Sequence, residues 1–335
     1  MSITSLGRNL GRRYRLVILF GGVVGLTMWG FSTLPATPPK SPQIPNPNGY
    51  DDLIRAGAAI RGPWPKGGDW KGADLSELRA FVDANRPALD LARLGLSRDG
   101  LASFDDSQAG LAVQMEQQGH IRSLSRLLLA QARIAEEEGR FGDAARIDFD
   151  LLEAGQMTTQ GALANTAALG WVVQSQALDQ LRRLRDHLSA RELRPMIEHL
   201  ERLDQRRTSI QALVDRWERW YLGAFPWWQR AWMGQSRVKA MARADQPKVL
   251  GNSRTRVELP SRYLTIAWAI HVHHEETGRW PRSVAEMVPS ILTAEPVDPA
   301  TMRPLVYPLN ASGELTDDLS MIGQAEGATV AAPRP

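Results

Sequence analysis

A run of nineteen residues near the N-terminus, Leu16–Leu34, carries no charge. A helix of this length rises about 28 Å, which matches the hydrocarbon thickness of a bilayer. The run follows four arginines, Arg8, Arg12, Arg13 and Arg15, and no acidic residue occurs before Asp51. Because basic residues stay on the cytoplasmic side, the sequence predicts a cytoplasmic stub (1–15), a single transmembrane helix (16–34) and an extracytoplasmic remainder.

The apolar run has two alternative interpretations. A cleaved signal peptide has the same basic start and apolar middle, but cleavage after Ala36 would place Leu34 where a small side chain is needed. We therefore favour a retained anchor in a bacterial inner membrane. Gly21 and Gly25 form a GxxxG pair through which two anchors could pack as a homodimer, although glycine is also common in membrane helices.

Composition narrows the partners. The formal net charge is +3, and the first fifteen residues contribute four positive charges, so the rest of the chain is close to neutral. A neutral remainder argues against nucleic acid as a partner, because phosphate binding needs a concentrated cationic face. The chain has no cysteine, which excludes disulfides, thiol catalysis and zinc–thiolate sites. The extracytoplasmic part must therefore be held together by its apolar core.

Residues 35–70 are predicted to be a proline- and glycine-rich spacer. Six prolines in 35–49 favour extended chain over helix. A short helix over Tyr50–Ile60 is the one regular segment expected here, and the GPWPKGGDW sequence at 62–70 ends it.

Residues 71–258 are predicted to form a helical domain. Apolar side chains recur at helical spacing, and Asp74 and Ser189 begin capping boxes with Glu77 and Glu192. Helices are expected from Asp74, from Pro87 to Gly95, from Ile121 to Gly139, from Asp143 to Gly155, from Ala162 to His187, from Ser189 to Leu203 and from Thr208. Short loops between them predict antiparallel neighbours.

One segment of this domain, 136–155, has Gly139 and Ala144 at small-residue positions. It resembles the turn and second helix of a tetratricopeptide-type repeat. Only one copy is recognisable, so we expect an irregular domain of helical hairpins.

A tryptophan-rich segment, 216–232, ends the helical domain. Its aromatic residues are candidates for contact with the membrane interface, where tryptophan is common; packing on the core and a ligand groove are the alternatives. The candidates are Trp217, Trp220, Tyr221, Trp227, Trp228 and Trp232. The following stretch, Lys239–Arg256, is polar and is predicted to be a loop.

The C-terminal tail, 259–327, begins with a helix over Tyr263–Glu276 and continues with turn and β-prone residues, before a disordered end at 328–335. Its motifs are Gly278, Trp280-Pro281, Met287-Val288, Pro296, Asp298-Pro299 and Tyr307. In this order they resemble the C-terminal region of type II secretion major pseudopilins, which implies a small α+β tail. A strand over 305–307, paired near Leu319–Ile322, is expected. Unlike a pseudopilin, the chain has Gly30-Phe31 at the end of its apolar run, so a filament role is not implied.

A histidine cluster in the tail helix contains the only metal-like residues, His271, His274 and Glu275. The zincin spacing is absent and neighbouring helical residues point in different directions, so packing is favoured over metal binding. No nucleophile elbow, phosphate loop or dinucleotide motif occurs, and no cofactor is expected.

The complete arrangement resembles bacterial single-span membrane-anchored proteins with no assigned activity. The sequence thus predicts a mainly α, anchored, extracytoplasmic scaffold that contacts the lipid bilayer and other envelope proteins and catalyses no reaction. The alternatives are an accessory component of a type II secretion or pilus-like system, and a metal-dependent hydrolase using the His271–Glu275 cluster.

Overall fold

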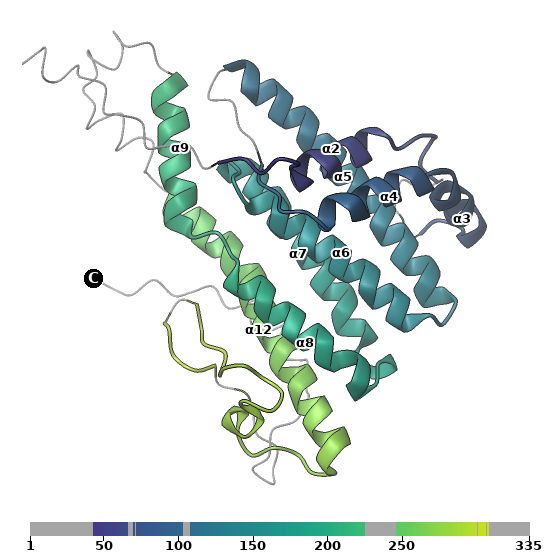
Figure 1. Cartoon of the computed structure of the whole chain (residues 1–335), viewed down its shortest axis with the longest axis vertical. Helices are drawn as coiled ribbons and strands as arrows, with labels where there is room; N and C mark the ends of the chain where they lie inside the picture. The colour runs from purple at the N-terminus through teal and green to yellow at the C-terminus, as the bar shows by residue number, and fades with distance from the viewer. Residues whose placement is uncertain are drawn as a thin grey trace, which may run out of the picture.

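The computed structural model describes residues 43–65, 70, 72–102, 108–224, 246–299, 301–305 and 307. This part of the chain is mainly α, as predicted. Figure 1 shows α5, α6 and α7 side by side, with α2, α3 and α4 at one edge and the long α12 beside α8 at the other. A continuous apolar core runs through these helices.

The helices follow the chain closely. They are α2 (Gly49–Ala58), α3 (Leu75–Ala84), α4 (Arg86–Leu96), α5 (Gln108–Glu137), α6 (Phe141–Thr159), α7 (Ala164–Leu184), α8 (Ala190–Gln205), α9 (Ile210–Ala224) and α12 (Gln246–Thr277). Two short 3-10 helices, η1 (Arg185–His187) and η2 (Val284–Met287), follow α7 and α12.

The second half of the predicted spacer belongs to the core. Tyr50 and Leu53 of α2 are fully buried, and α2 packs on α4 and α5. A Cβ on Gly49 would lie 2.4 Å from the carbonyl oxygen of Gly95, so glycine allows the backbones of α2 and α4 to touch. Asn48 caps α2 by accepting from the N–H of Tyr50. The boundary predicted at residue 70 is therefore wrong, because α2 is part of the helical domain.

The α5–α6–α7 segment corrects two predicted boundaries. Helix α6 begins at Phe141, so Asp143 lies in its first turn and is not its cap. The helix also continues past Gly155 to Thr159. Gly155 lies instead at the crossing with α7, where a Cβ would stand 2.8 Å from the carbonyl oxygen of Gly170. The glycine that read as a helix end is thus a site of close helix packing.

The predicted signals around α7 and α8 are confirmed. Helix α7 and η1 together end at His187, as expected. Ser189 and Glu192 form the predicted capping box, in which the N–H of Ser189 donates to Glu192 at 3.0 Å. Pro195 lies inside α8 without ending the helix.

The polar loop predicted up to Arg256 is wrong from Gln246 onward, because α12 begins there and runs unbroken for 32 residues. The helix also passes through the predicted domain boundary at 258/259. Polar residues in its first half serve internal contacts: Glu258 is buried and pairs with Arg254 and, at 3.7 Å, with Arg207. Its second half is buried on nearly all sides, around Trp268.

The tail after α12 lies against α8, shown in yellow-green in Figure 1. Arg194 of α8 pairs with Glu276 and donates to the carbonyl of Ser290 at 2.9 Å. The described part of the tail contains one isolated antiparallel bridge, Val297 with Pro304, and no strand. The strand predicted over 305–307 is therefore not formed there, and its expected partner at 319–322 lies outside the described residues.

The predicted anchor at 16–34, with Gly21 and Gly25, also lies outside the described residues. Among the helices that the structure does describe, none is both long and apolar enough to cross a membrane.

Candidate functional site

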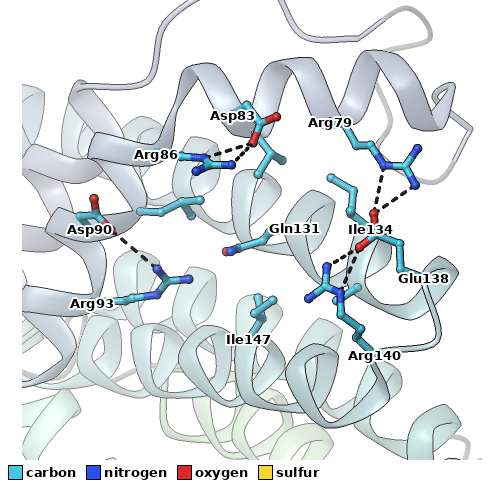
Figure 2. A pocket seen from close by; sticks show the side chains of 13 residues that line it. Arg79, Asp83, Arg86, Asp90, Arg93, Gln131, Ile134, Glu138, Arg140 and Ile147 are labelled. Carbon is cyan, nitrogen blue, oxygen red and sulfur yellow. Dashed lines mark hydrogen bonds and ion pairs between the residues drawn. The ribbon is translucent and has the colours of Figure 1, made fainter.

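A cavity of about 590 Å³ lies among α3, α4, α5 and α6. In Figure 2, α3 and α4 form one wall, α6 forms the opposite wall, and α5 lies behind the cavity. Part of the lining is apolar and consists of Val82, Leu89, Ile134, Ala135 and Ile147. The remaining lining residues are polar or charged, so the cavity combines an apolar base with charged edges. We call it the arginine pocket.

Four arginines and three carboxylates line the arginine pocket: Arg79, Arg86, Arg93 and Arg140, with Asp83, Asp90 and Glu138. Glu138 joins two walls, because it accepts from Arg79 at 3.1 Å and from Arg140 at 3.0 Å. The hydrogen bond from Arg140 lowers the pKa of Glu138. Arginines outnumber carboxylates, so the pocket has a positive balance.

Arg93 is the least engaged of the four arginines. Its guanidinium lies 3.7 Å from Asp90 and makes no hydrogen bond to any described residue. Arg86, in contrast, donates twice to Asp83, at 2.8 and 3.1 Å. These are pairs between exposed side chains, which are worth about 1 kcal/mol or less, so a ligand carboxylate can replace them at small cost.

Gln131 points from α5 into the middle of the pocket (Figure 2). Its Oε1 atom is buried and has no hydrogen-bond partner among the described residues. An amide in this state lowers stability, since a buried unpaired polar atom costs about 1–3 kcal/mol. The residue is therefore better explained by what the pocket holds than by the fold.

The sequence contains a signal for this pocket that our sequence analysis missed. Arg79, Asp83, Arg86, Asp90 and Arg93 alternate in sign at spacings of four, three, four and three residues. Such spacing places all five on one helical face. The face continues across the junction of α3 and α4, since α4 begins two residues after α3 ends. The side chain of Asn85 fixes this junction by donating to the carbonyl oxygens of Phe81 and Arg61.

A second cavity, of about 460 Å³, lies between α6 and α8. Phe149, Pro195 and Met196 give it apolar walls. His199 pairs with Glu153 at 2.7 Å and its ring lies 4.8 Å from that of Phe149. Asp150 lines the same cavity, and burial raises its pKa to about 6.

The Asp150 carboxyl predicts a pH-dependent change in stability. Its folded pKa of about 6 exceeds the unfolded value of about 3.9, so its stabilising contribution is complete below pH 4 and is lost as the pH rises through 6. Asp150→Asn should therefore be more stable than the wild type at pH 7.5, by up to about 3 kcal/mol, and equal to it near pH 4. Urea denaturation of both proteins in detergent at the two pH values measures this.

Asp148, whose pKa burial also raises, is unchanged in both proteins, so its contribution cancels in the comparison. Asp90→Asn is the control, since Asp90 is 75% exposed and its replacement should change stability by less than about 0.5 kcal/mol. An Asp150→Asn protein that gains as much at pH 4 as at pH 7.5 would contradict the assignment.

The predicted metal candidates are engaged with separate partners. His271 lies 3.2 Å from Glu275, whose second oxygen accepts from the N–H of Ala190. His274 is not part of this pair: its ring stacks on Trp280 with centroids 3.8 Å apart. Among the described residues, no group of three or more His, Cys, Asp or Glu side chains is placed to hold a metal ion.

The tryptophan-rich segment is described only in part. Trp217 and Trp220 lie half-buried on α9 with ring centroids 5.0 Å apart, and Trp217 packs against the core. Tyr221 also lies in α9, while Trp227, Trp228 and Trp232 lie outside the described residues. Membrane contact by this segment stays a prediction.

Comparison of the chain with protein-family models, with curated proteins and with solved structures gives no match.

Proposed function

We propose that this chain is an anchored envelope protein that binds another protein through the arginine pocket and catalyses no reaction of its own. The uncharged run at 16–34, preceded by four arginines, supports an anchor in the inner membrane with the bulk of the chain outside the cytoplasm. The lipid bilayer and other envelope proteins are then its partners, and the GxxxG pair of Gly21 and Gly25 is a possible contact between two anchors.

The observation that carries this proposal is the arginine pocket. A protein surface spends stability on an unpaired Gln131 and on a loosely paired Arg93 where a ligand repays the cost. The pocket lies on four helices that pack into one core, so a bound segment would meet a rigid surface. Rigid helical surfaces of this kind suit partner binding, because little order is lost on association.

A second proposal is an accessory role in a type II secretion or pilus-like system. The order of elements after α12 favours it: the helix ends at Thr277, Trp280-Pro281 follows, and a short helix (η2) precedes the Asp298 turn. This order is the one in which the pseudopilin-like motifs occur in the sequence. Loss of substrate export on deletion of the tail would support it, and unchanged export would reject it.

Site-specific photo-crosslinking in cells tests the main proposal. A photoreactive residue at Asp90, on the rim of the arginine pocket, should give a covalent adduct with one defined protein in the membrane fraction. The same residue at Val172, which is 54% exposed on α7 and outside the pocket, is the control and should give none. The proposal fails if position 90 yields no adduct, or if the chain is found in the soluble fraction.

A further inference from the structure

We infer that the arginine pocket recognises an extended, acidic segment of a partner protein: side-chain carboxylates pair with Arg86 and Arg93, and a main-chain peptide group pairs with the Gln131 amide. This inference rests on the proposed function and specifies its ligand. Its basis is the juxtaposition of unused donors, an unpaired amide and apolar lining in one cavity.

The charges select an acidic ligand. Guanidinium groups offer up to five N–H donors in a planar fork that fits a carboxylate, and charge-assisted pairs of this kind are stronger than neutral hydrogen bonds. Arg93 makes no hydrogen bond to any described residue, so its donors are available. Arg86 and Arg93 are seven residues apart on α4 and so lie about two turns from one another on the same face. Two carboxylates on one ligand could meet them together.

The Gln131 amide selects the backbone conformation of the ligand. An amide side chain both donates and accepts, which matches the N–H and C=O of a peptide group. In a helical ligand the interior peptide groups are already paired with one another, whereas in an extended segment they are free. The apolar lining at Val82, Leu89 and Ile147 would meet the side chains that alternate with the acidic ones.

Binding to the full chain in detergent tests this inference. The probe is a short fluorescein-labelled peptide of alternating glutamate and leucine, and its counterpart replaces each glutamate with glutamine. The acidic peptide should bind and the neutral one should bind at least about tenfold more weakly. Raising the salt concentration should weaken only the acidic peptide, since exposed charge pairs are screened.

Variants locate the binding. Arg86→Gln with Arg93→Gln should weaken the acidic peptide about tenfold or more, while the matched control, Arg122→Gln with Arg256→Gln, removes the same charge from exposed positions outside the pocket and should have little effect. Gln131→Met should weaken binding about threefold to tenfold without lowering the unfolding temperature, because it removes a buried unpaired atom. A residue with a merely structural role would lose stability together with binding.

Three results would overturn the inference: equal binding of the neutral peptide, equal loss in the control variant, or loss of stability in Gln131→Met. These outcomes are separable from failure of the proposed function. An adduct at position 90 with a segment that carries no acidic residues would reject the ligand class and leave the protein-binding role intact. Absence of any adduct would reject both.

Discussion

Gly170→Ala should destabilise the helical domain by about 3 kcal/mol, which is enough to shift the folding equilibrium more than a hundredfold. The new Cβ would lie 2.6 Å from the carbonyl oxygen of Gly155 and 2.7 Å from a methyl carbon of Thr159. The nearest obstacle is backbone in the middle of α6, so relief requires α6 and α7 to move apart. These two helices share the most extensive contact in the described fold. Urea denaturation followed by circular dichroism measures the loss.

Gly119→Ala is the matched control for this prediction. Gly119 lies in the interior of α5, and a Cβ there would meet no atom within 4 Å. Both substitutions gain the same intrinsic helix propensity, so Gly119→Ala should stabilise the protein by up to about 1 kcal/mol. A Gly170→Ala protein that behaves like Gly119→Ala would show that the α6–α7 crossing has room for a methyl group.

Arg207→Met should cost about 3–5 kcal/mol, the usual cost of breaking a buried ion pair on one side. The Arg207 side chain is 6% exposed and lies between Asp204, at 2.8 Å, and Glu258 of α12, which is 2% exposed. It also donates to Gln174 of α7 at 3.2 Å. Methionine retains much of the apolar stem, so the loss would come from the carboxylates left without this cation.

Two further variants identify the origin of that cost. Arg202→Met is the control on α8, because Arg202 is 54% exposed and lies 3.8 Å from Glu198, and it should cost less than about 1 kcal/mol. Adding Glu258→Leu to Arg207→Met removes the uncompensated charge and should restore part of the lost stability. A double variant no more stable than Arg207→Met would place the cost in packing instead. Thermal or urea denaturation of the three proteins decides between these results.

The sequence was informative where a helix end has its own chemistry. The Ser189–Glu192 box, the proline at the start of α4 and the end of η1 at His187 were all found in the structure, because caps are encoded within a few neighbouring residues. Local signals failed where a residue serves a distant contact. Gly155 resembled a helix end and instead lies against Gly170 of another helix.

Helix α12 shows the same limit on a larger scale. Its first half looked like a polar loop because Arg254 and Glu258 belong to an ion-pair network that includes Arg207, nearly fifty residues earlier in the chain. Its second half has no amphipathic stripe, since it is buried on nearly all sides. The arginine pocket could have been found from the alternating signs of residues 79–93, but its Gln131 could not, because nothing in the sequence around it shows that its oxygen is unpaired.

The position of α12 in the chain also determines when this protein can finish folding. Helices α7 and α8 bury part of their apolar surface against α12, and α12 ends at Thr277. A nascent chain therefore leaves that surface uncovered until the ribosome has made most of the polypeptide, and a product that stops before Gln246 never covers it. Such unfinished chains expose the kind of surface that promotes aggregation. Synthesis of this protein thus has a late closing step, and shortened products should be removed by proteases rather than accumulate as stable fragments.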